Sequence, residues 1–215
     1  MIVYGASLSP FVRKVLAYGA EKGLELEHKP LGLGSDDPDF LKASPFRKIP
    51  GFSDGDFAIS DSSAIIHYLE AKYPDPPLIP AEPEARARVI WFDEFADTIL
   101  CACGAKMFFN RIVAPRFLGR EGDLETADKA EREELPPILD YLERTIPENG
   151  WLVGDGITLA DIAVATAFAN LRHLGIEIDP GRHPKVAEFS GRMLARPSFA
   201  GWVEREAAFL EKTAA

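Results

Sequence analysis

Residues 44–65 read SPFRKIPGFSDGDFAISDSSAI, and this stretch carries the clearest structural signal in the chain of 215 residues. Pro50 precedes two short runs of strand-forming residues, 51–53 and 57–59, which the turn sequence Asp54-Gly55 joins. An Asp-Gly pair between two such runs is typical of a β-hairpin, and proline is tolerated at the first position of a strand. The stretch therefore predicts an antiparallel hairpin.

A helix is expected directly after the hairpin. The sequence Ser60-Asp61-Ser62 supplies capping side chains, and apolar residues recur at helical spacing from Ile65 to Tyr73, before Pro74 ends the pattern. The whole stretch thus predicts a ββα unit.

The residues before the hairpin predict alternating strands and helices. Ile2 to Tyr4 form a β-type run, and a helix follows in which Ser9 fits the N-cap, Pro10 the first helical position and Gly23 the left-handed C-terminal position. A second strand over 24–28 and a short helix over 37–43 complete the order βαβαββα, which we assign to an α/β domain over residues 1–76.

Residues 77–84 are expected to link this domain to a second one. The stretch 74–83 holds five prolines, a density that disfavours helix and strand. Strand patterns disappear after it, so an all-helical domain is predicted for 85–215, with helices at 85–113, 124–146, 158–174, 184–195 and 197–212. Pro136-Pro137 fall inside the second of these, where a kink or break is expected.

Composition narrows the classes of partner and compartment. A formal charge of -10 disfavours binding to phosphate backbones, so nucleic acid is not expected as a partner. The opening MIVYGAS has no basic region or cleavage site, and no apolar run is long enough to span a membrane, so we expect a cytoplasmic protein. Cys101 and Cys103, two residues apart on a predicted helix, point in different directions and are expected to be reduced thiols.

Four motifs, in this order, resemble the glutathione transferase superfamily over nearly the whole chain. Residues 7–14 (SLSPFVRK) are similar to the family's active-site helix start in its serine-proline-phenylalanine form, found in tau-class and related bacterial members. Residues 44–50 and 61–65 resemble the segments around its cis-proline and its glutamate-serine motif, and 154–163 (GDGITLADIA) its bundle capping motif. The resemblance implies a thioredoxin-like first domain that binds glutathione, and a helical second domain that helps to bind a small hydrophobic electrophile.

Ser9 is the candidate for stabilising the glutathione thiolate. A thiol with a pKa of about 8.5 is mostly protonated at neutral pH, so a transferase needs a hydrogen-bond donor near the sulfur. A hydroxyl at a helix start can donate, and the helix dipole acts in the same direction. Two alternatives stay open: Ser9 only caps the helix, or Ser7 is the donor. Disulfide exchange through this position is excluded, because serine forms no mixed disulfide.

The resemblance also implies where the rest of glutathione binds. Pro50 is expected to be cis, so that Ile49 offers its backbone N–H and C=O to the cysteinyl part, with an ordinary trans turn as the alternative. Asp61 and Ser62 stand at a helix start that favours a carboxylate, and Asp61 could pair with the γ-glutamyl ammonium or merely cap the helix. Lys48 matches a position that meets the glycine carboxylate, or is only a surface charge.

The electrophile is expected to meet the first helix of the second domain and the start of the first helix of the chain. The candidate residues share helical spacing or the active-site motif, and they are Phe11, Cys103, Met107, Phe108, Arg111 and Ile112. The alternative is that most of the helical stripe belongs to the bundle core. Thr158 and Asp161 form a predicted capping box, with Ile157 and Ile162 as its hydrophobic staple, and serve stability.

Three functions remain open on this pattern. The first is addition of glutathione thiolate to an electrophilic carbon; the second is glutathione-dependent isomerase, peroxidase or lyase chemistry on the same fold; the third is a non-catalytic interaction module. The four histidines show no metal-ligand spacing and no phosphate-binding glycine loop occurs, so neither metal nor nucleotide is expected. The resemblance implies a homodimer.

Overall fold

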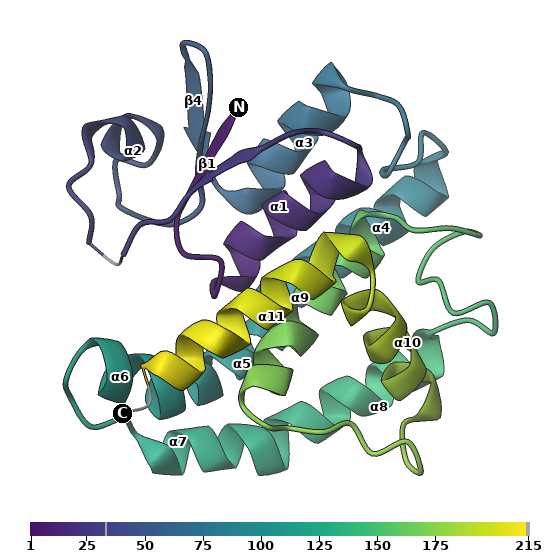
Figure 1. The fold of residues 1–215 in the computed structure, drawn as a ribbon. Coiled ribbons are helices and arrows are strands. Elements are labelled where there is room, and N and C mark those ends of the chain that lie inside the picture. Colours follow the sequence, from purple (N-terminus) through teal and green to yellow (C-terminus); the bar gives the residue numbers. More distant parts are fainter. Residues whose placement is uncertain (33, 214–215) are drawn as a thin grey trace.

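The computed structural model describes residues 1–32 and 34–213 and divides into a sheet-containing half and a helical half (Figure 1). The four-stranded sheet has the order β2-β1-β3-β4. Its strands are β1 (Ile2–Tyr4), β2 (Glu27–Lys29), β3 (Gly51–Asp54) and β4 (Phe57–Ser60). β1 pairs with β2 in parallel, and the β1–β3 and β3–β4 pairs are antiparallel.

The helices of this half are α1 (Pro10–Glu21), α2 (Pro38–Ala43) and α3 (Ser62–Lys72). The order βαβαββα and the thioredoxin-like class are therefore confirmed. The hairpin is also present: Gly51 pairs with Ser60 and Asp54 with Phe57, so the turn residues are Gly55 and Asp56. Gly55 has φ 59°, which glycine adopts without steric cost.

The second strand begins three residues later than predicted, at Glu27 instead of Leu24. After Gly23, with φ 68°, the Leu24 N–H donates to the Gly19 carbonyl at 2.8 Å and so still belongs to the end of α1. Pairing with β1 starts only where the Glu27 N–H reaches the Met1 carbonyl at 2.9 Å.

Residues 73–82 contain neither helix nor strand, and their backbone is held from both sides. A carboxylate oxygen of Glu70 accepts the N–H groups of Leu78 and Ile79 at 3.1 and 3.0 Å. The Leu78 carbonyl accepts the N–H of Leu159, from the helical half, at 2.9 Å. The exact division into domains at residues 76 and 85 stays a prediction.

The helical half is built from two long helical stretches, three further helices and short connections. The predicted helix over 85–113 runs from Pro83 to Phe117 and includes two five-residue π-helical segments. The segments are α4 (Pro83–Phe95), η1 (Ala96–Leu100, π), α5 (Cys101–Phe108), η2 (Phe109–Val113, π), α6 (Ala114–Phe117), α7 (Leu124–Lys129), η3 (Ala130–Glu134, π), α8 (Leu135–Thr145), α9 (Leu159–His173), α10 (Pro184–Leu194) and α11 (Pro197–Lys212).

Pro136 and Pro137 do not break the second long helical stretch. They lie in the first turn of α8, where missing N–H groups cost least, and the wider π-helical turn of η3 precedes them. Glu134, the last residue of η3, keeps helical backbone angles of φ -93° and ψ -40°. The expected break is therefore a local change of helical pitch.

Helix α9 is the centre of the helical half, and its residues from Leu159 to Leu171 are all buried. The predicted capping box at its start is present: the Thr158 N–H donates to the Asp161 carboxylate at 2.9 Å, and Asp161 also accepts the Leu152 N–H at 2.9 Å. Helix α1 packs against both α9 and α11, which joins the two halves (Figure 1). Within the described residues, no helix is long and apolar enough to cross a membrane.

Candidate active site

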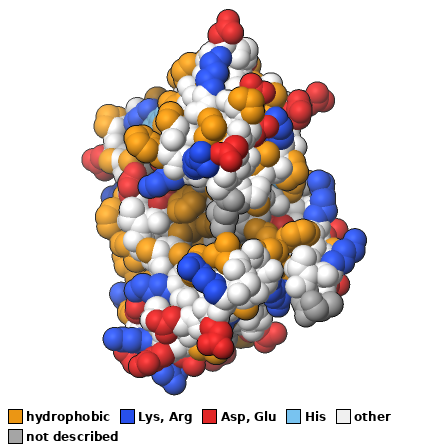
Figure 2. All heavy atoms as spheres, turned by 90° about the vertical axis from the view of Figure 1, so that its left-hand side faces the viewer, with side chains coloured by type: hydrophobic (Ala, Val, Ile, Leu, Met, Phe, Trp, Pro, Cys, Tyr) orange, Lys and Arg blue, Asp and Glu red, His pale blue; other side chains and the backbone are white. Residues whose placement is uncertain are grey.

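A cavity of about 620 Å³ lies between the two halves of the molecule. It is visible as a hollow lined by hydrophobic side chains in Figure 2. One wall comes from the loop after β1, the start of α1 and Ile49, and the other from residues 97–118, α9 and α11. Most of the lining is apolar, so the cavity suits an apolar ligand.

Ser9 occupies the N-cap position of α1 and lines the cavity. Its backbone angles, φ -71° and ψ 125°, are those of an N-cap, yet its side chain accepts no hydrogen bond from the helix N–H groups. The hydroxyl is thus not used for capping and is available to a ligand. Ser7 is half-buried and lies outside the cavity lining. Of the two candidate donors, Ser9 therefore lines the cavity and Ser7 does not.

The N-terminus of α1 adds a positive electrostatic potential beside the Ser9 hydroxyl. Pro10 and Phe11, at the first helical positions, both line the cavity, as predicted for Phe11. The first turn of α1 contains no acidic residue that would neutralise the helix dipole. An anion beside Ser9 would therefore be stabilised by the dipole as well as by the hydroxyl.

Ile49 also lines the cavity, and the Ile49–Pro50 peptide bond is cis. The loop before it is held by buried Ser44, whose hydroxyl donates to the Lys48 carbonyl at 2.6 Å and accepts the Lys48 N–H at 3.0 Å. The Lys48 side chain itself is exposed. The loop thus presents the Ile49 backbone in a defined position, as a site for an extended peptide requires.

Gly5, which the sequence did not single out, sets the position of Ile49. Its φ is 129°, and a Cβ atom built on it would lie 2.7 Å from the Ile49 Cβ and 2.9 Å from Val12 Cγ2. On the expectation that Ile49 binds glutathione, Gly5→Ala should displace Ile49 and raise the KM for glutathione about tenfold, since a misplaced binding group costs affinity. Steady-state kinetics would measure it. The control is Gly23→Ala, which also places a side chain at positive φ (68°) but has no atom within 4 Å; an equal KM rise there would contradict the interpretation.

Asp61 and Ser62 lie at the start of α3 as predicted. Asp61 caps the helix, accepting the Ala64 N–H at 3.0 Å, and has φ 83° and ψ 127°, angles that are costly for any residue except glycine. Backbone strain of this kind concentrates at binding sites. Ser62 is buried at the first helical position, so its N–H group is one of the unpaired donors of the helix start.

A buried ionic cluster that the sequence did not reveal lies beside the cavity. The Lys14 ammonium group, on α1, is fully buried and donates to Asp93 at 2.8 Å and to Asp97 at 2.6 Å. Asp97 lies in the π-helical segment η1 and lines the cavity. Burial raises the pKa of its carboxyl above the ordinary value in spite of the Lys14 charge. Within the described chain, Asp97 Oδ1 has no hydrogen-bond partner.

The cavity is lined by a different face of α5 from the one predicted to meet the electrophile. Every fourth residue from position 97 to position 117 lines the cavity: Asp97, Cys101, Ala105, Phe109, Val113 and Phe117. Three of the predicted residues, Cys103, Met107 and Arg111, lie two positions further along, about 200° around the helix. Phe108 does line the cavity, as predicted.

Those three residues have other partners. Cys103 and Met107 are buried in the bundle core, so the alternative that the stripe forms core is correct for them. Arg111 pairs with Asp128 at 2.7 Å and Glu131 at 2.5 Å, and Ile112 is buried in a small cluster with Phe108. Small residues, above all Ala102, Gly104 and Ala105, leave the room that the cavity occupies.

Cys101 lines the cavity but does not supply a reactive thiolate of the protein. Burial raises the pKa of its thiol to about 12, so it stays protonated at neutral pH. Among the residues the structure describes, no group of three or more His, Cys, Asp or Glu side chains is placed to hold a metal ion. The expectation that neither metal nor nucleotide is needed stays a prediction.

Comparisons with known proteins agree with this arrangement. Residues 3–77 match the family model for the glutathione S-transferase N-terminal domain, and residues 96–197 match that for the C-terminal domain. Glutathione S-transferase 3 of Zea mays is 33% identical over 211 residues, which are 96% of this chain and 88% of the maize protein.

Two solved structures are similar over most of the chain. A glutathione S-transferase from Methylobacterium radiotolerans, in complex with glutathione sulfonate, has a TM-score of 0.77 at 31% identity, covering 94% of this chain and 93% of the other. One from Rhodospirillum rubrum has a TM-score of 0.84 at 27% identity, covering 94% and 90%. With a hydroxyl at the start of α1, a cis peptide before β3 and an apolar cavity between the two halves, the chain belongs to the glutathione S-transferase family.

Proposed function

We propose that this protein is a glutathione transferase in which Ser9 stabilises the thiolate of bound glutathione for attack on an apolar electrophile in the interdomain cavity. The observation that carries the proposal is the Ser9 hydroxyl, which stands at the start of α1, lines the cavity and is not used for capping. No other hydroxyl side chain lines that cavity among the described residues.

The tripeptide is bound mainly by backbone groups and charges of the first domain. The Ile49 backbone pairs with the cysteinyl part, as an extended peptide pairs with an edge. The N–H groups at the start of α3, with Ser62, receive the γ-glutamyl carboxylate, and Asp61 receives the γ-glutamyl ammonium. Lys48 is exposed and has the reach to meet the glycine carboxylate.

The chemistry needs only one ionised sulfur. A charge-assisted hydrogen bond from Ser9 is worth about 1.5 to 3 kcal/mol, and the helix dipole adds about 0.3 to 1 kcal/mol, which together lower the thiol pKa by about one to three units. The thiol proton leaves to solvent on binding. The thiolate then forms the new S–C bond, and the electrophile either loses its leaving group or takes up a proton.

Aromatic side chains define the electrophile site in this proposal. Phe109 is partly exposed at the cavity wall, so Phe109→Ala removes contact area without opening the core. We expect the KM for an apolar aromatic electrophile to rise about five- to twentyfold, with the KM for glutathione nearly unchanged. Steady-state kinetics with each substrate varied would show it. Phe57→Ala, on β4 away from the cavity, is the matched control, and an equal rise there would exclude this wall as the site.

The function is tested by combining calorimetry with product analysis. We expect glutathione to bind and its thioether adduct to accumulate when an electrophile with a leaving group is added. Isomerised or reduced product without an adduct would instead indicate isomerase or peroxidase chemistry, and cleavage of an ether would indicate a lyase. Failure of glutathione to bind in calorimetry would overturn the proposal and favour an interaction module.

The proposal also covers the oligomeric state of the enzyme and its cellular compartment. We propose a cytoplasmic homodimer that takes no nucleic acid or membrane as a partner, in line with the charge of -10. A sedimentation experiment is expected to give about twice the chain mass of 23.6 kDa. A species of 23.6 kDa alone would refute the dimer.

A further inference from the structure

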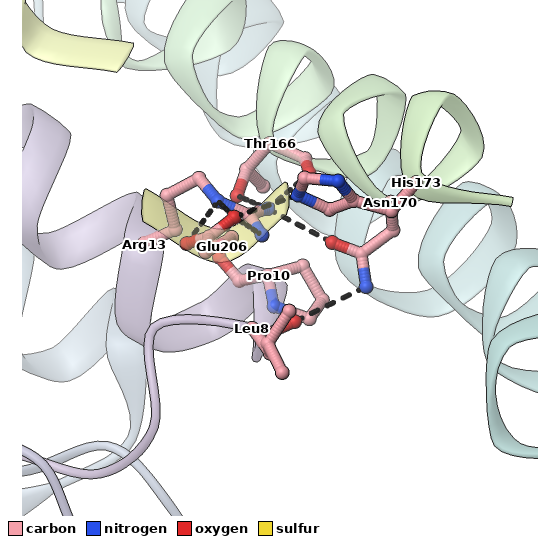
Figure 3. A network of polar contacts seen from close by, with 7 residues as sticks. All are labelled: Leu8, Pro10, Arg13, Thr166, Asn170, His173 and Glu206. Carbon is pink, nitrogen blue, oxygen red and sulfur yellow. Dashed lines mark hydrogen bonds and ion pairs between the residues drawn. The ribbon is translucent and has the colours of Figure 1, made fainter. Parts of the chain in front are cut away.

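A buried polar network joins α1 to the helical half, immediately beside Ser9 (Figure 3). Its centre is Arg13, whose side chain is fully buried. The guanidinium donates to the Glu206 carboxylate on α11 through Nη2 at 2.6 Å and Nε at 3.1 Å. It also donates through Nη1 to the Thr166 carbonyl and the Asn170 side chain on α9, each at 2.8 Å. His173 contacts the same Glu206 oxygen at 2.9 Å.

This network ends on the two peptide carbonyls that flank Ser9. The Thr166 hydroxyl donates to the Pro10 carbonyl at 2.7 Å, and the Asn170 amide donates to the Leu8 carbonyl at 3.1 Å (Figure 3). Both donors belong to α9, one turn apart; the Leu8 acceptor belongs to the loop before α1, and the Pro10 acceptor is the first residue of α1. The backbone on each side of Ser9 is thus bonded to the helical half, in addition to the bonds that Ser9 makes with Ala6 and Arg13 in its own domain.

From these contacts, we propose that Thr166 and Asn170, aligned by Arg13 and Glu206, are positioning residues that hold the Ser9 hydroxyl at the glutathione sulfur. The inference rests on the proposed role of Ser9. Because that hydroxyl makes no capping bond, its place depends on the position of its backbone, and a shift of the loop moves the donor away from the sulfur. Thr166 does not line the cavity, so it acts without touching a ligand.

The network also connects the electrophile site to the thiolate donor. Asn170 lines the cavity, accepts from Arg13 and donates to the Leu8 carbonyl, so a single side chain contacts both the electrophile space and the active-site loop. Phe209, three residues after Glu206 on α11, lines the same cavity. A ligand in the cavity would therefore contact α9 and α11, the two helices that carry the partners of Arg13 in this network.

The bond from Thr166 fixes the backbone beside Ser9, whereas the buried ion pair behind it joins the two halves. The Pro10 carbonyl, in the first turn of α1, accepts a hydrogen bond from the Thr166 hydroxyl, 156 residues away in the sequence. The Thr166 carbonyl in turn accepts a hydrogen bond from Arg13 Nη1. Each group in the chain from Glu206 through Arg13 to α9 is buried and has a partner. Removing one hydroxyl at its end changes the alignment of the loop and leaves the charges paired.

The test compares Thr166→Val, which keeps the shape and removes the hydroxyl, with Thr166→Ser, which keeps the hydroxyl. In the full-length enzyme saturated with glutathione, we expect Thr166→Val to raise the pKa of the bound thiol by about half a unit to one unit and to lower kcat about three- to tenfold, with the KM for glutathione within about twofold. Thr166→Ser is expected to restore both values. Thr145→Val, which removes a similar hydroxyl-to-carbonyl bond in α8, is the matched control and should change neither.

A double variant separates positioning through Ser9 from general loosening. In a Ser9→Ala background, Thr166→Val should cause no further change of the thiol pKa, because the donor that it positions is gone. If the bound thiol has the wild-type pKa in Thr166→Val, while Ser9→Ala still raises it, the positioning role is overturned and the proposed function stays intact. If Ser9→Ala itself leaves the thiol pKa unchanged, the proposed function fails first. If the two changes add in full, Thr166 does not act through Ser9.

Discussion

Replacing Glu206 with glutamine is expected to lower the free energy of unfolding by about 3 to 5 kcal/mol, because it removes one partner of a buried ion pair. The Arg13 side chain is fully buried and Glu206 is 2% exposed, so water cannot solvate the Arg13 charge that is left without its partner. The amide of the new side chain would have the shape of the carboxylate but not its charge, and it would also face His173. Urea unfolding followed by circular dichroism would measure the loss.

The control for this prediction is an ion pair on the protein surface that also contains a glutamate. Glu134 and Lys106 are 35% and 45% exposed and lie 2.7 Å apart. Exposed ion pairs contribute about 1 kcal/mol or less, so Glu134→Gln should hardly change the unfolding midpoint. Equal losses in the two variants would mean that the Arg13 pair does not hold the two halves together.

The same pair predicts how stability depends on pH. Burial alone would raise the pKa of the Glu206 carboxyl, but the charges of and hydrogen bonds from Arg13 and His173 outweigh burial and place the pKa below its ordinary value. A depressed carboxyl pKa contributes stability that is present above the unfolded-state value of about 4.3 and is lost as the pH falls through the folded-state value. The wild type should therefore lose more stability than Glu206→Gln when the pH falls below about 4.

Ser9→Ala is expected to lower kcat about ten- to hundredfold at neutral pH, the equivalent of losing one charge-assisted hydrogen bond to the thiolate. The KM for glutathione should change little, because in the proposed site Ile49, Asp61 and Ser62 bind parts of the tripeptide other than its sulfur. The loss should shrink at higher pH, where the glutathione thiol ionises without a hydrogen bond from Ser9. Initial rates across a pH series would show both effects.

Ser7→Ala is the matched control for this variant. Ser7 has the same side chain two residues earlier on the loop but lies outside the cavity lining, so we expect a smaller loss of kcat. If Ser7→Ala instead caused the larger loss, the role of donor would pass to Ser7. The loop would then have to turn its other face to the sulfur in the glutathione complex.

Much of the fold follows from local signals in the sequence. The hairpin around Gly55, the capped helix after Asp61 and the capping box of Thr158 with Asp161 all involve residues a few positions apart. Each is set by backbone preferences or by side chains that reach their own helix start, so sequence alone predicts them. The position of β2 was less predictable, because Leu24 suits a strand but is bonded to the end of α1.

The cavity wall could not be predicted in the same way. A search for a ligand wall among large apolar side chains selects Met107, whereas the cavity exists where Ala102 and Ala105 are small. The π-helical segments η1 and η2 also change the number of residues per turn on either side of α5. A helical period counted along the sequence therefore does not show which face meets the first domain.

The buried charged residues were the feature of the site least predictable from the sequence. Arg13 and Lys14 are the last two residues of the active-site motif and look like surface residues, but both are fully buried. Their partners stand 193 and 79 residues away in the sequence, on helices whose packing decides the pairing. The network that anchors Ser9 is for this reason a property of the packed domains and not of the motif.

The central claim is tested most directly by titrating the thiol of glutathione bound to the wild-type protein, through the ultraviolet absorbance of its thiolate. We predict a thiol pKa about one to three units below the value of about 8.5 for a free cysteine thiol, and a shift back toward that value in Ser9→Ala. A thiol that titrates near its free value in the wild-type complex, or equally low in both proteins, would contradict the account.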